Sequence, residues 1–171
     1  IVGDPLSPYA TTKKINEMYA EVYAKTYGLK YIGLRYFNVF GERQDPNGPY
    51  AAVIPKWTES ILKRKKVYIY GDGKTSRDFC YVGNVVQANL KAALTENTKA
   101  LNQIYNIAYG EKTSLNKLFK LIKKELNASS HVMPIYKDFR EGDIRHSHAD
   151  ISKAIKNLGY LPEYSIHKGI K

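Results

Sequence analysis

The chain reads Ser7-Pro8-Tyr9-Ala10-Thr11-Thr12-Lys13-Lys14 at the start of its first predicted helix. Ser7 can act as the N-cap, and Pro8 takes the first helical position, where its missing N–H costs nothing. Residues four apart lie on one face of a helix, so the phenol of Tyr9 and the ammonium of Lys13 can point into the same space. A positive charge beside a phenol favours its ionised form, which acid/base chemistry requires. Taken alone, a tyrosine and a lysine at this spacing more often have a structural role than a catalytic one, because both residue types are abundant in this chain.

Helices and strands alternate along the rest of the chain. The first helix is expected at residues 8–26, ends near Gly28, and is followed by a strand at 31–37. Further helices are expected at about 53–64, 83–95, 114–126 and 150–158, the last with Asp150 as N-cap, and further strands at about 67–70, 75–79, 104–108 and 133–136. The strands at 67–70 and 75–79 should pair as a hairpin across Gly71-Asp72-Gly73. Helices between strands favour a parallel α/β sheet, with a smaller part that contains antiparallel pairing.

The composition indicates a strongly basic chain. Its 171 residues suffice for one domain with a real core, and the net charge of +11 raises nucleic acid or an anionic membrane as partners. The lysines are dispersed, however, and the densest run, residues 63–66, closes an expected helix, where cations suit the helix dipole. A basic surface that faces acidic substrates is therefore favoured over nucleic-acid binding. The sequence contains no signal-peptide pattern and no apolar stretch of transmembrane length, so we expect the cytoplasm and no membrane partner.

Three short patterns are better explained by structure than by chemistry. Cys80 lies in the apolar run 79–82 and is predicted to be a buried thiol. Gly73-Lys74-Thr75 matches the end of a phosphate-binding P-loop, but that motif needs a glycine where Tyr68 stands and a helix afterwards. His146-Ser147-His148 has no carboxylate or thiol cluster at ligand spacing, so no metal site is expected.

Several longer blocks accompany the pair formed by Tyr9 and Lys13. They are Leu34-Arg35-Tyr36-Phe37-Asn38-Val39-Phe40-Gly41, Tyr50-Ala51-Ala52-Val53-Ile54-Pro55-Lys56-Trp57, Tyr68-Ile69-Tyr70-Gly71-Asp72-Gly73, Thr75-Ser76-Arg77-Asp78-Phe79-Cys80-Tyr81-Val82 and Phe139-Arg140-Glu141-Gly142-Asp143-Ile144-Arg145-His146-Ser147, followed by Asp150. In this order the set resembles the C-terminal half of the extended short-chain dehydrogenase/reductase family, that is, the NAD-dependent epimerases and dehydratases. Within it, the chain is most similar to the UDP-N-acetylglucosamine 4-epimerases of bacterial surface-polysaccharide synthesis, from about Pro5 to Lys171.

The resemblance implies an α/β fold. Residues 1–171 would be the C-terminal part of a doubly wound, Rossmann-like parallel sheet, interleaved with a small α/β substrate-binding region at about 39–82 and 109–171. Members of the family begin with a glycine-rich turn that holds the pyrophosphate of NAD at a helix N-terminus. No such glycine cluster occurs in this chain. We therefore expect a partial domain that lacks most of the dinucleotide-binding half and is inactive alone.

The resemblance assigns the catalytic and cofactor roles. Tyr9 would take the proton from the C4 hydroxyl of a UDP-sugar as hydride leaves C4 for NAD⁺, and the resulting 4-keto sugar would turn over and be reduced on its opposite face. Lys13 would bond the nicotinamide ribose and hold Tyr9 acidic. Tyr36 and Val39 would lie beside the nicotinamide. Helix 8–26 carries an apolar stripe of Ile15, Met18, Val22 and Tyr23. In the family the corresponding stripe joins a dimer interface, so the resemblance implies a homodimer when the protein is full length.

The resemblance also assigns the substrate contacts. These are Asn38 at the diphosphate or sugar, the backbone of Ala52 and Val53 with the ring of Trp57 as walls, Tyr68 at the uracil, Arg77 and Arg140 at the diphosphate, and Asp143 near the ribose. Tyr70 stands where the family has a smaller polar residue, which leaves its contact in doubt. A guanidinium suits a diphosphate because it can bond two phosphate oxygens at once.

From the residues alone, other interpretations remain open. Asn38 could simply cap a strand end, Trp57 could be a core residue, and the arginines could pair with Asp78 or Glu141. At the level of function, a nucleotide-sugar 4,6-dehydratase of the same family is the nearest alternative. A basic, noncatalytic nucleic-acid-binding module is the alternative from a different class.

Overall fold

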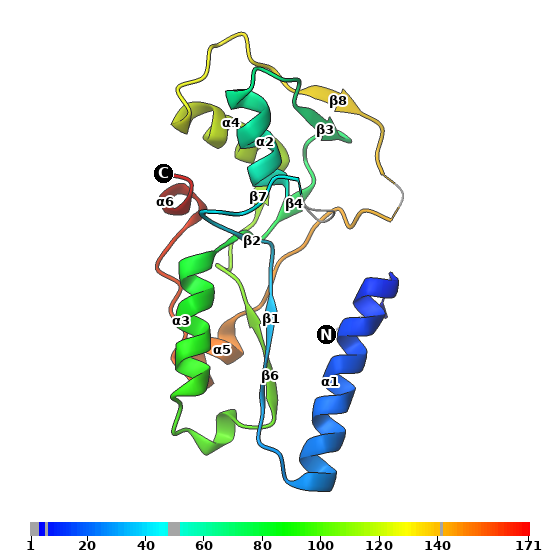
Figure 1. The fold of residues 1–171 in the computed structure, drawn as a ribbon, viewed down its shortest axis with the longest axis vertical. Coiled ribbons are helices and arrows are strands. Elements are labelled where there is room, and N and C mark those ends of the chain that lie inside the picture. Colours follow the sequence, from blue (N-terminus) through cyan, green and yellow to red (C-terminus); the bar gives the residue numbers. More distant parts are fainter. Residues whose placement is uncertain (1–3, 6, 48–51, 141) are drawn as a thin grey trace.

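Two parallel strands at the centre of the structure have helices on both sides (Figure 1). The computed structural model describes residues 4–5, 7–47, 52–140 and 142–171. Strand β1 (Ile32–Tyr36) pairs in parallel with β6 (Gln103–Ile107), so that the first residues of the two strands are opposite each other. Helix α3 (Val82–Ala93) lies on one side of this pair and α1 (Pro8–Tyr27) on the other (Figure 1). The parallel pairing of β1 with β6 confirms the predicted parallel α/β arrangement. Two parallel strands need a crossover connection, and here that connection contains α3.

A smaller region lies at one end of this pair (Figure 1). Its helices are α2 (Val53–Leu62), α4 (Leu115–Glu125) and α6 (Ile166–Gly169). Its strands are β2 (Val39–Phe40) parallel to β5 (Cys80–Tyr81), β3 (Tyr68–Tyr70) parallel to β8 (Ile135–Lys137), and β4 (Ser76–Arg77) antiparallel to β7 (Thr113–Ser114). The helix α5 (Ser152–Leu158) and the short 3₁₀ turn Thr98–Ala100 return to the central strands. The chain thus passes repeatedly between the two regions.

Each region has its own hydrophobic core. Beside the central strands, Tyr105 and Ile107 of β6 are fully buried together with Tyr160. In the smaller region, α2 and α4 face each other, and the rings of Trp57 and Phe119 meet edge to face with their centroids 6.0 Å apart. Both helices bury residues three or four positions apart, as the sequence periodicity predicts.

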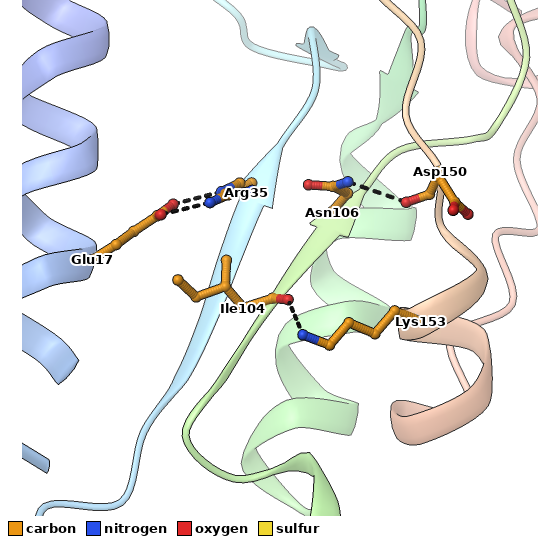
Figure 2. A network of polar contacts seen from close by, with 6 residues as sticks. All are labelled: Glu17, Arg35, Ile104, Asn106, Asp150 and Lys153. Carbon is orange, nitrogen blue, oxygen red and sulfur yellow. Dashed lines mark hydrogen bonds and ion pairs between the residues drawn. The ribbon is translucent and has the colours of Figure 1, made fainter. Parts of the chain in front are cut away.

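Helix α1 forms as predicted but buries none of its residues. Ser7 Oγ accepts the Ala10 N–H at 3.2 Å, and Gly28 ends the helix in the left-handed conformation with φ 70°. A partly buried ion pair joins α1 to β1: Arg35 donates from Nε and Nη2 to the two carboxylate oxygens of Glu17, at 2.5 and 2.6 Å (Figure 2). The predicted apolar stripe is exposed, and its members are Ile15, Met18, Val22 and Tyr23.

The free edge of β6 is bonded to α5 and the segment before it (Figure 2). Lys153 Nζ donates to the Ile104 carbonyl at 3.0 Å, and Asn106 Nδ2 donates to the Asp150 carbonyl at 3.1 Å. The first bond satisfies a backbone carbonyl of β6, and the second joins the Asn106 side chain to the segment before α5.

The predicted hairpin of residues 67–70 with 75–79 is wrong. Strand β3 pairs with β8, and β4 pairs with β7. The N–H of Gly71 donates to the Lys137 carbonyl at 2.8 Å, so the backbone continues the parallel ladder past the end of β3 instead of folding back. Gly71 and Gly73, with φ 82° and 71°, then turn the chain into β4. Because a strand and not a helix follows Gly73-Lys74-Thr75, the P-loop interpretation is excluded.

Three further local details differ from the sequence predictions. The N-cap of α5 is Ile151, although Asp150 Oδ1 still accepts the Ser152 N–H at 2.9 Å. Helix α2 ends at Leu62, so the basic run 63–66 lies beyond its last turn, and the short helix α6 is not predicted at all.

No helix within the described ranges has both the length and the apolar character needed to cross a membrane.

Candidate functional site

A cavity of about 820 Å³ lies between α2, the carboxyl end of β1, β3 and the segment after β8. Its wall includes every residue predicted at the substrate, together with Val39; the full set is Asn38, Val39, Ala52, Val53, Trp57, Tyr68, Arg77, Arg140 and Asp143. A neighbouring cavity of about 620 Å³, between α2 and α6, contains none of them. Residues distant in sequence thus converge on one hollow. Tyr50 and Ala51 of the same sequence block lie outside the described residues.

The two arginines present positive charge to this cavity without a carboxylate partner in the described part of the chain. Arg77 Nη1 donates to the carbonyls of Ser76 and Arg145, at 3.0 and 3.4 Å, which leaves Nε and Nη2 without a partner among the described residues. The Arg140 guanidinium lies 3.6 Å from the centroid of the Tyr70 ring. Neither arginine pairs with Asp78, and Glu141 lies outside the described residues.

Asp78 is occupied instead by backbone N–H groups. Its fully buried carboxylate accepts from Tyr109 at 3.1 Å, from Gly110 at 3.1 and 3.2 Å, and from Ala149 at 3.4 Å. Burial raises the pKa of Asp78, while these N–H groups oppose that shift. The residue after Arg77 therefore ties the loop that follows β6 to the segment before α5.

Sequence reasoning missed three lysines of the cavity wall. They are Lys56, Lys65 and Lys66, and they join the two arginines against two acidic lining residues among those that the structure describes, Glu59 and Asp143. The signal was present in the basic run 63–66, but that run was assigned to the end of a helix. Since α2 stops at Leu62, Lys65 and Lys66 instead lead into β3 at the cavity wall. The cavity therefore carries a surplus of positive charge suited to an anionic ligand.

Asn38, after β1, and the start of α2 contribute polar groups to the cavity wall. Asn38 follows β1 with φ 35°, a conformation that asparagine tolerates, and its Nδ2 donates to the Asp78 carbonyl at 3.0 Å. Ala52 is the N-cap of α2 and provides no side-chain bond. The first N–H groups of α2 are therefore not capped by Ala52, at the positive end of the helix dipole.

Three aromatic residues line the cavity near β3. Trp57 is only 6% exposed and belongs to the core, and its Nε1 donates to the Tyr68 carbonyl at 3.2 Å, so the indole N–H is not available to a ligand. The Tyr68 ring lies 4.1 Å from Lys137 Nζ. Arg140 lowers the pKa of the Tyr70 phenol, first by a polar contact with it and then by its positive charge.

Tyr9 and Lys13 lie together, but apart from the cavity. Lys13 Nζ is 5.2 Å from the centroid of the Tyr9 ring, which is 60% exposed at the first turn of α1. Tyr36 points to the other face of β1 from Arg35, and its hydroxyl donates to Asn89 on α3 at 3.0 Å. Among the described residues, the cavity wall therefore contains Val39 but not Tyr9, Lys13 or Tyr36.

The remaining reactive side chains have structural roles. Cys80 is fully buried, as predicted, and burial raises the pKa of its thiol to about 11. His146 Nδ1 lies 2.9 Å from Ser76 Oγ, and His148 Nε2 lies 3.0 Å from the Gly110 carbonyl oxygen. Within the described ranges, no group of three or more possible metal ligands occurs.

Comparison with known proteins places the chain in a family. The family model described as "NAD dependent epimerase/dehydratase family" matches residues 2–108. The chain belongs to this family. Its members depend on NAD as cofactor, and its α/β, Rossmann-like fold agrees with the parallel pairing of β1 and β6.

Individual members of the epimerase/dehydratase family are similar along nearly the whole chain. A Methanocaldococcus jannaschii protein named "Putative UDP-glucose 4-epimerase" is 45% identical over 98% of this chain and 52% of its own length. The solved UDP-glucose 4-epimerase of Thermotoga maritima with UDP-glucose is 44% identical, with a TM-score of 0.91, over 98% of this chain and 52% of that one. The UDP-N-acetylglucosamine 4-epimerase of Methanobrevibacter ruminantium, in complex with UDP-N-acetylmuramic acid, is 41% identical, with a TM-score of 0.88, over 98% and 53%. The chain thus spans about half the length of these relatives.

Proposed function

We propose that this chain carries the substrate-binding part of an NAD-dependent UDP-sugar 4-epimerase, formed by about residues 39–82 and 109–171. The reaction would interconvert UDP-N-acetylglucosamine and UDP-N-acetylgalactosamine in surface-polysaccharide precursor synthesis. The main support is the convergence of all the expected substrate residues on one cation-rich cavity. The Methanobrevibacter ruminantium relative, a UDP-N-acetylglucosamine 4-epimerase, supports the choice of sugar.

The cavity suits a UDP-sugar by its charge and shape. A diphosphate is a compact dianion, and Arg77 keeps two donor nitrogens available beside Lys65, Lys66 and Arg140. The N–H groups of Val53 and Ile54, at the start of α2 in the cavity wall, add backbone donors, since Pro55 has none. Tyr68 and the face of Trp57 provide flat apolar surface for a base, while Asn38 and Asp143 offer polar atoms to the sugars.

The donor set of α1 suits NAD. The Tyr9 ring and the Lys13 ammonium lie together on an exposed helical turn, where the phenol and the ammonium would be available to the hydroxyls of a ribose. When bound, NAD supplies the acceptor and then the donor of the C4 hydride. Tyr9 would take the proton of the C4 hydroxyl as the hydride leaves C4, which leaves a 4-keto sugar. Tyr9 returns the proton when the carbonyl is reduced from its opposite face, which inverts C4.

Binding of UDP to residues 1–171 tests the substrate half of the proposal. We expect calorimetric titration to show UDP binding that Arg77→Gln weakens about ten-fold or more, as for a lost charge-assisted hydrogen bond. Arg64→Gln is the matched control, because Arg64 is exposed and outside the cavity wall but carries the same charge. Salt-sensitive binding of an oligonucleotide, with no response to UDP, would favour the nucleic-acid-binding alternative.

Turnover tests the catalytic half. Residues 1–171 alone should not convert UDP-N-acetylglucosamine, because they contain no glycine-rich NAD turn. In a longer polypeptide that supplies this turn, Tyr9→Phe should abolish formation of the C4 epimer while NAD stays bound. An unchanged rate would remove Tyr9 from its role. Release of a 4-keto-6-deoxy product would reassign the protein to the dehydratases.

The homodimer and the cytoplasmic location are part of the same proposal. The exposed apolar stripe of α1 supports a helical dimer interface, because a surface of this kind is normally covered. Val22→Lys, on this stripe, should shift the molar mass measured by light scattering from dimer to monomer. A wild-type monomer at assay concentration would contradict the dimer.

A further inference from the structure

The segment between β8 and Arg145 carries two cavity residues, and its described residues form few backbone hydrogen bonds with the rest of the protein. At its start, the Gly71 N–H donates to the Lys137 carbonyl at 2.8 Å, and at its end the Ser76 N–H donates to the Arg145 carbonyl at 2.9 Å. Between these points, the only backbone bond among the described residues joins the Asp143 N–H to the Arg140 carbonyl, within the segment. Backbone bonds of the described residues thus do little to fix the segment around Arg140.

Aromatic rings hold this segment instead. The ring of Phe139 lies directly over Gly71, where an added Cβ would come within 2.1 Å of a ring carbon. Arg145 stacks on Phe139, with its guanidinium carbon 4.5 Å from the ring centroid, and forms an ion pair with Asp72 at 3.2 Å. Arg140 stacks more closely, at 3.6 Å from the Tyr70 centroid.

Tyr70 is a fixed platform for this contact. Residues 68 and 70 point to one face of β3, while Ile69 between them is fully buried in the core on the other face. The same face stacks a second cation, since Lys137 lies 4.1 Å from the Tyr68 ring. The pairing of β3 with β8 thus sets two tyrosine rings beneath two cations.

We propose that Tyr70 is the positioning residue that holds the Arg140 guanidinium at the cavity wall, ready to bond the diphosphate of the substrate. This inference rests on the proposed function, and it concerns a residue for which that function provides no role. An arginine held in place by a ring loses less side-chain freedom when the ligand binds, so the stacked state favours binding. The described residues offer Arg140 no carboxylate that could do the same.

A double-mutant cycle on residues 1–171 tests the proposal. Tyr70→Leu should weaken UDP binding about five-fold, the size expected for one cation–π contact, whereas Tyr70→Phe, which keeps the ring under Arg140 and loses only the phenol oxygen, should weaken it less. Affinity for uridine, which lacks phosphates, should not change. In the Arg140→Ala background, Tyr70→Leu should have no further effect. Tyr136→Leu is the control, because Tyr136 is an exposed tyrosine of the same strand pair outside the cavity wall.

Two results would overturn the inference. One is an undiminished effect of Tyr70→Leu in the Arg140→Ala background, which would mean that Tyr70 touches the ligand itself. The other comes from the free protein, by NMR titration of ¹³C-labelled tyrosine assigned with Tyr70→Phe. Arg140→Gln should raise the lowered pKa of Tyr70, and an unmoved titration would refute the contact. Failure of the wild type to bind UDP would instead overturn the proposed function, and with it the role of the pair at a diphosphate.

Discussion

Replacing Asp78 with alanine should cost this protein a large part of its stability, although Asp78 is not a predicted site residue. Its carboxylate is completely buried and accepts backbone N–H groups from Tyr109, Gly110 and Ala149. The first two follow the central strand β6, and the third precedes α5. Alanine leaves all three without their acceptor, next to Arg77 at the cavity wall.

The magnitude follows from those bonds. A buried N–H left without an acceptor costs about 1–3 kcal/mol. The bonds of Tyr109 and Gly110 are 3.1 Å long and count fully, while that of Ala149, at 3.4 Å, counts weakly. Removal of the carboxylate also relieves the penalty of burying a charge, so we expect a net loss of about 3 kcal/mol, toward the low end of the sum. Asp78→Asn keeps one oxygen acceptor and should lose about 1 kcal/mol.

Urea unfolding, followed by the fluorescence of Trp57, measures this loss. Trp57 is the single tryptophan and lies in the core, so its emission reports on unfolding. Asp138→Ala is the matched control, because Asp138 is exposed. A loss of less than about 0.5 kcal/mol for Asp78→Ala, within the range of ordinary surface changes, would refute the reasoning.

The pH dependence gives a second check on Asp78. Burial raises its folded-state pKa above the usual 3.8, so the folded protein holds this proton more tightly than the unfolded chain does. The stabilising contribution of this linkage is complete below the unfolded pKa and is lost as pH rises through the folded pKa. The stability difference between wild type and Asp78→Asn should therefore narrow as pH rises through that interval, and a difference that widens would contradict the direction.

Three other changes test separate parts of the structure. Arg35→Lys, which replaces the two-bonded contact with Glu17 by a single one, should lower stability by about 1 kcal/mol and speed hydrogen exchange in α1; unchanged exchange would show that the pair does not hold the helix. Cys80 should resist iodoacetamide at pH 8 until urea unfolds the chain, because its pKa is about 11 and its thiol is buried; mass spectrometry would detect early labelling. Asn84→Ala should cost about 2–3 kcal/mol in thermal unfolding, because Asn84 Oδ1 accepts the N–H groups of Glu163 and Tyr164; a shift no larger than that of an exposed asparagine would contradict this role.

Much of the site could be named through the resemblance of the motif blocks to a known family. That resemblance supplied nine residues that the structure gathers around one cavity, whereas residue types and spacing alone left structural roles open for Asn38, Trp57 and the arginines. The lysines at positions 56, 65 and 66 were missed, since their place in the wall depends on where α2 stops and β3 begins. The contact of Arg140 with Tyr70 depends on the pairing of β3 with β8, which no turn residue announces.

The sequence by itself determined the features that depend on near neighbours: the capped start of α1, the pairing of Tyr9 with Lys13 one turn later, the helix and strand periods, and the burial of Cys80. These follow from capping and periodicity, which act over a few residues. Only the tertiary structure decided the partners of β3 and β4, the two segments tied together by Asp78 and the cation-lined cavity. Each of these joins residues distant in the chain, and such pairings are selected by the packing of the whole core rather than by any local preference.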